Sequence, residues 1–183
     1  KDAITVRQLL THFSGLRPDF DLAVQWEGYA ATMEHLWRET ASGEAEKEFV
    51  YSDLNFITLG EIVQRVSGQS LDAFVRQHLF DALGLDETAF NPPAAWRGRI
   101  APTEPRGRSL QYLNGKAGRE ILEEILRGSV HDPTAWRMGG VAGHAGLFSS
   151  ARDVSVYGQL LLNRGNYMGK RVFSPITVEA MTT

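Results

Sequence analysis

The sequence contains no cysteine, which excludes disulfide bonds, thiolate metal sites and cysteine nucleophiles together. It also has no apolar run approaching the roughly 18 residues of a transmembrane helix, so we predict no membrane span in this chain. An excess of basic charge is missing as well, because 19 Lys and Arg stand against 22 Asp and Glu. A net charge of −3 gives no attraction toward nucleic acid, and we expect no nucleic-acid partner.

The start of the sequence lacks both an initiator methionine and a signal peptide. The chain opens on Lys1-Asp2, and a helical pattern begins within a few residues. We therefore expect a piece of a longer protein, for which missing targeting signals carry no information. With 183 residues, 43% of them hydrophobic, this piece can bury a core as one domain or as one lobe of a larger domain.

Alternation of apolar and polar residues, the pattern of a half-buried strand, is nearly absent, whereas helical spacing recurs along the chain. The spacing and its flanking cap residues predict helices over residues 5–13, 28–39, 53–66, 70–83, 151–163 and from 174 onward, with a short one over 120–126. The predicted apolar faces include Leu9 and Leu10, Met33 and Trp37, Leu54 and Val66, and Leu160 and Val154. Residues 91–118, rich in proline and glycine, predict a long irregular loop. The expected fold class is mainly α with few short strands.

One polar triplet, Tyr51-Ser52-Asp53, stands at the start of the third predicted helix. It can be a helix N-cap, in which Ser52 or Asp53 accepts hydrogen bonds from free backbone N–H groups and the acid suits the positive end of the helix dipole. It can also be a catalytic box, in which a phenol and two short polar side chains point into a cleft. The triplet taken alone favours the cap.

Four segments in a fixed order resemble a known family. They are residues 4–16 (ITVRQLLTHFSGL), 49–68 (FVYSDLNFITLGEIVQRVSG), 80–85 (FDALGL) and 139–163 (GGVAGHAGLFSSARDVSVYGQLLLN). Together they resemble the serine β-lactamase and penicillin-binding-protein-like hydrolases, in the branch of class C β-lactamases, DD-carboxypeptidases and related esterases. The resemblance implies that residues 1–183 are the mostly helical lobe of a two-lobe β-lactamase/transpeptidase-like fold, without its α/β lobe. It also reverses the preference at Tyr51 toward the catalytic box.

The chemistry of this family needs three short boxes, and the sequence contains one of them. Ser-x-x-Lys, which supplies the nucleophile and its activating amine, is absent because no serine has a lysine three residues later. The second box of the family, Tyr-x-Asn, corresponds to Tyr51-Ser52-Asp53. The third is Lys-Thr-Gly or His-x-Gly on a strand, but Lys116-Ala117-Gly118 lies in a predicted coil and His144-Ala145-Gly146 leads toward a predicted helix cap. The resemblance therefore implies that the first and third boxes lie outside this chain.

The resemblance implies a role for each residue of the second box. A free phenol is a poor base at neutral pH, but a neighbouring ammonium favours the phenolate, so Tyr51 would take the proton of the nucleophile and return it to the leaving group. The alternative for Tyr51 is a packed residue with local hydrogen bonds. Asp53 stands where the family has Asn, and an ionised Asp only accepts hydrogen bonds. It can orient the first-box lysine but cannot donate to a β-lactam amide, which favours an esterase or a peptidase.

Ser52 and His144 are the other candidates for substrate contacts, with helix capping as the alternative for Ser52 and a plain turn residue as the alternative for His144. The pair His131-Asp132 together with His144 could suggest a metal site. Its spacing is not that of two ligands on one helix face, and we predict no metal. The sequence gives no sign of a cofactor either.

Three hypotheses remain at this stage. In the first, the whole protein is a serine hydrolase that forms an acyl-enzyme with an ester, a peptidoglycan peptide or a β-lactam, and this chain alone is inactive. In the second, a protein of the same fold binds a peptide or cell-wall ligand without turnover. The third is a free-standing helical interaction module, at the cost of exposed apolar surface through which the fragment could also dimerise. A cell-wall enzyme would be periplasmic, secreted or envelope-anchored.

Overall fold

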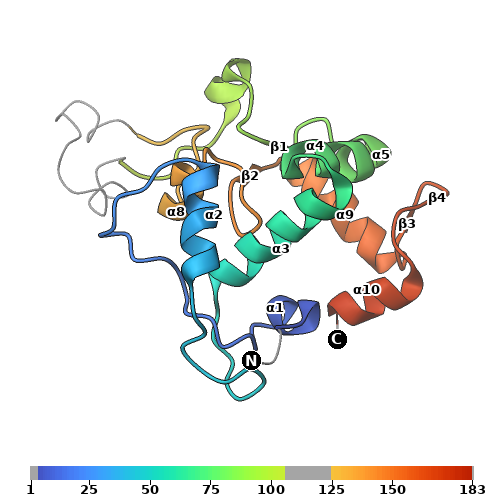
Figure 1. Cartoon of the computed structure of the whole chain (residues 1–183). Coiled ribbons are helices and arrows are strands. Elements are labelled where there is room, and N and C mark those ends of the chain that lie inside the picture. Colours follow the sequence, from blue (N-terminus) through green and yellow to red (C-terminus); the bar gives the residue numbers. More distant parts are fainter. Residues whose placement is uncertain (1–3, 106–124, 183) are drawn as a thin grey trace.

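The computed structural model describes residues 4–105 and 125–182, and this part of the chain is mainly helical, as expected (Figure 1). Its α-helices are α1 (Val6–Leu10), α2 (Tyr29–Arg38), α3 (Asp53–Ser67), α4 (Leu71–Val75), α5 (Asp81–Leu83), α8 (Pro133–Arg137), α9 (Ala151–Leu162) and α10 (Pro175–Thr182). A π-helical turn (Arg76–Phe80) joins α4 to α5, and a 3-10 turn (Ala94–Arg99) lies in the long loop. Two antiparallel pairs of two-residue strands complete the fold: β1 (Ala89–Phe90) with β2 (Leu147–Phe148), and β3 (Asn166–Tyr167) with β4 (Lys170–Arg171).

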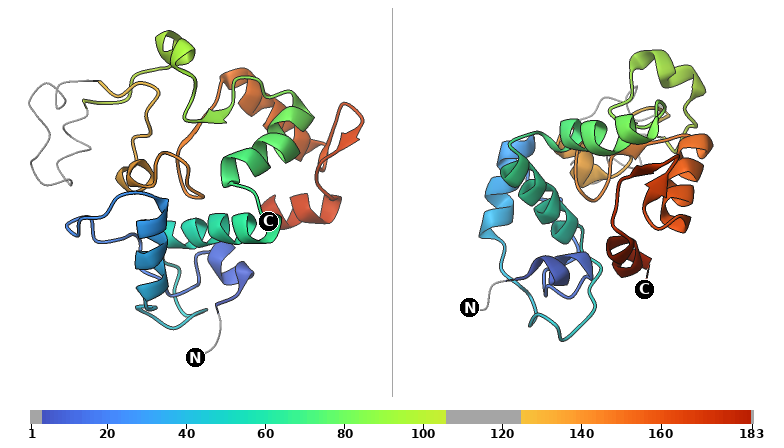
Figure 2. Two further views of the ribbon diagram at one scale, coloured as in Figure 1. Left: turned by 45° about the horizontal axis from the view of Figure 1, so that its top comes forward. Right: turned by 90° about the vertical axis from the view of Figure 1, so that its right-hand side faces the viewer.

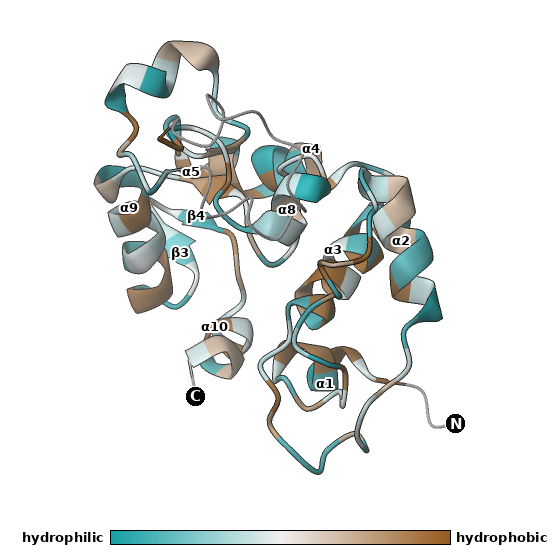
Figure 3. Ribbon diagram, turned by 90° about the vertical axis from the view of Figure 1, so that its left-hand side faces the viewer, coloured by the Kyte–Doolittle hydropathy of each residue, from teal (hydrophilic) through white to brown (hydrophobic). Residues whose placement is uncertain are grey.

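The helices form two groups, each with its own core. In the right-hand view of Figure 2, α1 to α3 lie on one side and α9 and α10 on the other, with the green segment around α4 and α5 above them. The first core gathers side chains of α1, α2, α3 and α8, among them Leu9, Met33, Leu36, Leu54, Ile57 and Ala135. The second joins the end of α5 to α9 through Phe80, Leu83, Leu85, Val156 and Leu160. Apolar residues mark α1 and α3, which pack on each other (Figure 3).

Several helix ends follow their sequence signals. Thr5 and Gln8 form a capping box at α1, and the Ser150 hydroxyl accepts a hydrogen bond from Asp153 N–H at the start of α9. Gly68 ends α3 in the left-handed conformation that glycine adopts at little cost. The first predicted helix stops at Leu10 rather than residue 13, because the chain turns at His12, where φ is +61°.

Some predictions about the helices are wrong. Leu10, Trp37, Val66 and Val154 are exposed, not part of the apolar faces that face a core. Trp37 instead lies under the Arg65 guanidinium, 4.9 Å from the ring centroid. Of the short helix predicted over 120–126, residues 120–124 lie outside the described residues, and Ile125 forms an isolated β-bridge with Pro105. The short helix α8 was not predicted, although Asp132 caps it and Pro133 opens it.

Large apolar side chains also lie on the surface. The most exposed of them are Val66 at the end of α3, Leu162 at the end of α9, Met168 between β3 and β4, and Ile176 in α10. Among the described residues, no helix has both the length and the apolar character that crossing a membrane requires.

Candidate active site

The second box lies at the N-terminal end of α3, and the segment before α2 covers its backbone. Ser52 N–H donates to His12 Nδ1 at 3.0 Å, and Asp53 N–H donates to the Pro18 carbonyl at 2.7 Å. The Ser52 side chain forms no capping hydrogen bond, because its hydroxyl donates to the Arg17 carbonyl at 2.6 Å and is fully buried. Ser52 therefore anchors the box to the neighbouring loop and has no side-chain atom free for a ligand.

Tyr51 is fixed by its ring while its hydroxyl stays free. The ring lies 4.6 Å from the His12 imidazole, centroid to centroid, with 32° between the planes, and the side chain is 66% exposed. None of the described residues forms a hydrogen bond with the Tyr51 hydroxyl. A phenol held in place and open to solvent can exchange a proton with a group that approaches from outside this chain.

His12 supports Tyr51, a role that the sequence motifs do not indicate. Its Nδ1 faces two donors, Ser52 N–H and the Asn55 amide Nδ2 at 3.3 Å, so Nδ1 is the unprotonated acceptor. Asn55 is fully buried, and its Oδ1 accepts from the Ser14 hydroxyl at 2.5 Å. This buried network fixes the imidazole on which the Tyr51 ring packs. The sequence signal, a histidine directly after a helix and before Phe13-Ser14-Gly15, was visible but does not specify the contact.

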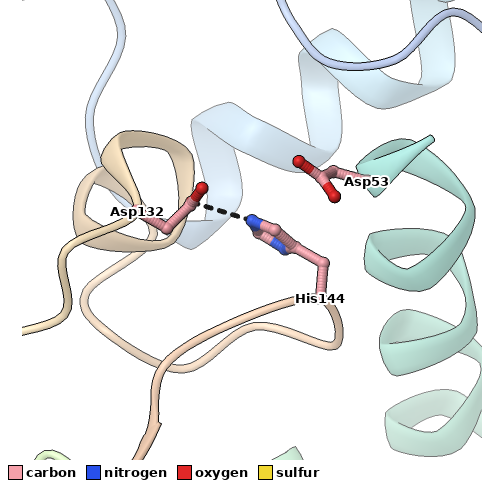
Figure 4. Close-up of side chains that lie close together, drawn as sticks. All are labelled: Asp53, Asp132 and His144. Carbon is pink, nitrogen blue, oxygen red and sulfur yellow. Dashed lines mark hydrogen bonds and ion pairs between the residues drawn. The ribbon is translucent and has the colours of Figure 1, made fainter. Parts of the chain in front are cut away.

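Asp53 meets two residues that are far away in the sequence (Figure 4). Asp132, the N-cap of α8, accepts from Ala135 N–H at 2.7 Å and lies 2.9 Å from His144 Nε2. One carboxylate oxygen each of Asp53 and Asp132 and one ring nitrogen of His144 lie within 4.8 Å of one another. The glycine-rich loop that carries His144 (residues 139–146) lies tight against α3, since a Cβ on Gly143 would be 2.0 Å from the Phe56 carbonyl oxygen.

The carboxyl groups in and around this cluster have pKa values shifted in different directions. Burial raises the pKa of Asp53, and the charge of Asp132 adds to this, while His144 and His12 oppose it. Burial would raise the pKa of Asp132 too, but hydrogen bonds from His144 and from Ala135 N–H lower it below its usual value. Burial also raises the pKa of Asp19, against hydrogen bonds from Phe20 N–H and Thr134. Among the described residues, no side chain forms an ion pair or a hydrogen bond with the Asp53 carboxylate.

The two tripeptides that resemble the third box lie in different parts of the chain. Lys116-Ala117-Gly118 lies outside the described residues. His144-Ala145-Gly146 leads, as predicted, to a helix cap, with the short strand β2 in between. This strand has two residues and pairs with β1, and Ser150 caps α9 two residues after it. His144 also contributes to the cluster at α3.

The arrangement of these helices is that of β-lactamases and penicillin-binding proteins. The octameric penicillin-binding protein homologue from Pyrococcus abyssi superposes with a TM-score of 0.67 over 98% of this chain and 38% of that chain, at 19% identity. FmtA from Staphylococcus aureus superposes with a TM-score of 0.68 over 98% of this chain and 44% of that chain, at 16% identity. These likenesses define the fold as the mainly α part of a larger β-lactamase-type fold.

The chain belongs to the Beta-lactamase family, whose model matches residues 1–182. Among similar sequences, the "Putative D-alanyl-D-alanine carboxypeptidase" of Escherichia coli (strain K12) is 32% identical over all of this chain and 44% of the relative. The N-acetylmuramyl-L-alanine amidase of Bacillus subtilis (strain 168) is 33% identical over all of this chain and 43% of the relative. The chain thus spans less than half the length of these curated relatives.

Proposed function

We propose that this chain forms the helical wall of the active site of a serine hydrolase that cleaves an amide bond of a peptidoglycan peptide through an acyl-enzyme. The observation that carries the proposal is Tyr51, whose ring is fixed by His12 while its hydroxyl is free, beside the unpaired carboxylate of Asp53. The names of the relatives, a D-alanyl-D-alanine carboxypeptidase and an N-acetylmuramyl-L-alanine amidase, support a peptide rather than an ester or a β-lactam.

In the proposed reaction, the Tyr51 phenolate accepts the proton of a serine hydroxyl supplied by a Ser-x-x-Lys box outside this chain. The serine oxygen attacks the carbonyl carbon, the carbon–nitrogen bond breaks, and Tyr51 gives the proton to the departing amine. Water then releases the acid from the acyl-enzyme. The lysine ammonium of the same box lies beside Asp53 and compensates the carboxylate that the described residues leave unpaired.

The identity of the residue at position 53 also bears on the substrate. An ionised carboxylate accepts hydrogen bonds and cannot donate them. A substrate carbonyl or β-lactam amide oxygen placed against Asp53 would therefore meet a second acceptor. A substrate that presents an N–H or ammonium group at this position fits better, which favours a peptide over a β-lactam.

Covalent labelling of the whole protein tests the proposal. After incubation with a fluorophosphonate and, separately, with a penicillin, intact mass and peptide mapping should show one adduct on the serine of a Ser-x-x-Lys box. Residues 1–183 alone serve as the negative control and should turn over neither nitrocefin nor p-nitrophenyl esters above buffer. Absence of any adduct on the folded whole protein would contradict the hydrolase and favour a non-catalytic cell-wall-binding protein. Turnover by the chain alone would contradict the assignment of the nucleophile.

A further inference from the structure

The cluster at the start of α3 has a composition that the second box does not explain. Its three members come from three separate places: Asp53 from α3, Asp132 from the N-cap of α8, and His144 from the glycine-rich loop. Within the described part of the chain, this is the group of three carboxylate and imidazole side chains whose ligand atoms all lie within 4.8 Å. Only tertiary folding brings them together, since the first and last are 91 positions apart in the sequence (144 − 53).

The His144 ring gives a second, independent sign of a missing ligand. Its side chain is 3% exposed, and Nδ1 is buried without a hydrogen-bond partner among the described residues. Leaving a polar atom buried and unpaired costs free energy, so native structures seldom keep one without a use for it. The one hydrogen bond of the ring within the described residues joins Nε2 to Asp132.

We propose that Asp53, Asp132 and His144 bind a divalent transition-metal ion such as Zn²⁺. The two ionised carboxylates neutralise the charge of one such ion, and no ion pair within the described residues engages Asp53 already. One imidazole and two carboxylates form a mixed nitrogen and oxygen set, which suits Zn²⁺, Co²⁺ or Mn²⁺ better than Ca²⁺ or Mg²⁺, which prefer oxygen ligands alone. A water molecule would take the remaining position of a four-coordinate ion.

Binding of a metal ion requires only small movements of these three side chains. Bonds from Zn²⁺ to imidazole nitrogen and carboxylate oxygen are about 2.0–2.2 Å long, so two ligands of one tetrahedral ion lie roughly 3.5 Å apart. The separation of up to 4.8 Å in the structure therefore has to shrink by roughly 1 Å. Rotation of the Asp53 side chain can supply this, because its carboxylate is not held by another described residue.

Zinc binding to residues 1–183 can be measured without any turnover. Equilibrium dialysis or titration calorimetry with ZnCl₂, in buffer cleared of metal by a chelating resin, should give one Zn²⁺ per chain. Asp53→Asn, Asp132→Asn and His144→Ala should each weaken the affinity by at least about tenfold. Replacement of Zn²⁺ by Co²⁺ should give visible absorption bands that Asp53→Asn diminishes.

The controls separate this site from adventitious binding to surface histidines. His131→Asn removes an exposed imidazole next to Asp132 in the sequence, and it should leave the affinity unchanged. Far-ultraviolet circular dichroism checks that His144→Ala still folds, and Asp53→Asn, at a partly exposed position, serves if it does not. Absence of one-to-one Zn²⁺ binding, or binding that survives Asp53→Asn and Asp132→Asn, would overturn the proposal. In the whole protein Zn²⁺ and the first-box lysine would compete for the Asp53 carboxylate. A failure of zinc binding to residues 1–183 would leave the nucleophilic serine assigned, and a failure of serine labelling would leave zinc binding to residues 1–183 unaffected, so the two proposals fail separately.

Discussion

Tyr51 is the residue on which the proposed hydrolase depends most directly. In the whole protein, Tyr51→Phe should lower kcat by about 100-fold or more, which is the scale of a lost general acid–base group. The fold should be unaffected, because the free hydroxyl forms no hydrogen bond with the described residues and the phenylalanine ring keeps the contact with His12. Steady-state kinetics with a peptidoglycan peptide measure the effect. Tyr157→Phe, in the second core, is the matched control and should retain kcat; an unchanged kcat in Tyr51→Phe would remove Tyr51 from the mechanism.

Asp19 gives a prediction about pH. Burial raises its folded-state pKa above the unfolded value, so its ionisation costs stability. This cost is absent below the unfolded pKa and grows as the pH rises through the folded pKa. The free energy of unfolding of Asp19→Asn, relative to the wild-type chain, should therefore be higher at pH 7 than at pH 3.5. The gain should be at most about 1 kcal/mol, discounted for the solvent screening of a half-buried group.

Urea unfolding at the two pH values measures this difference for the chain alone. The asparagine variant can form a weaker hydrogen bond with Thr134 than Asp19 does. This lowers its free energy of unfolding by the same amount at both pH values, because asparagine does not titrate. Asp21→Asn, at an exposed position two residues away, reports the general effect of removing one negative charge. A difference between Asp19→Asn and wild type that does not change with pH would show that Asp19 is not the group responsible.

At the level of single residues, the sequence identified part of the site. Tyr51, Asp53 and His144 were named from short motifs, and the structure places Asp53 and His144 in one cluster. Asp132 was named together with His131 and His144, in a pattern whose spacing did not predict a metal site. Its contact with His144 depends on where the glycine-rich loop packs, which no local spacing encodes. The burial of Ser52 was equally invisible, because its hydroxyl binds a backbone carbonyl of a distant loop.

The contact between the glycine-rich loop and α3 decides whether His144 reaches Asp53. Gly143→Ala places a methyl group on the Phe56 carbonyl oxygen and should destabilise the chain by about 1–3 kcal/mol, as overpacking commonly does. Gly158→Ala is the matched opposite, because this helical glycine of α9 has no atom within 4 Å of an added Cβ. It should stabilise the chain by about 0.5–1 kcal/mol. Denaturant unfolding of both variants measures the effects, and equal effects would mean that the loop does not pack as described.

At the level of helices, capping signals were more informative than apolar periodicity. Thr5, Ser150 and Pro175 start their helices where predicted, because each signal acts on backbone groups within one turn. The assignment of Trp37 and Val154 to buried faces was wrong, since burial depends on which neighbouring element covers a face. Leu9 and Leu160, from the same predicted faces, are buried because α3 covers α1 and residues of the second core cover α9.

For the whole molecule, periodicity predicted a mainly α chain, and the family resemblance added the larger fold to which such a chain belongs. Helical spacing predicts a set of helices, but it does not say that they form two groups with separate cores. The two cores were not predicted by the sequence. Four segments in order indicated the family, and the family match over residues 1–182 confirms the membership. The domain assignment, a helical subdomain over residues 1–183, stays a prediction.

The exposed apolar surface at α9 and α10 gives a prediction for the chain in isolation. Leu162 in α9 is 80% exposed, and Ile176 in α10 is 78% exposed. Residues of both helices, among them Leu161, Leu162 and Val178, line one hollow. Burial of such side chains between two copies is favourable at about 25 cal/mol per Å² of apolar surface. We therefore expect residues 1–183 to self-associate through this surface as the concentration rises, and sedimentation velocity over a concentration series measures it.

Substitutions on this surface show whether association uses α9 and α10 or nonspecific apolar contacts. Leu162→Asp combined with Ile176→Asp should raise the dimer dissociation constant by at least about tenfold, equivalent to about 1.4 kcal/mol. The control is Val66→Asp, because Val66 is 85% exposed but lies at the end of α3, in the other group of helices. If Val66→Asp weakens association equally, the contact is not specific to α9 and α10. If the wild-type chain stays monomeric throughout, solvent covers this surface in isolation, and its apolar residues need another occupant in the whole protein.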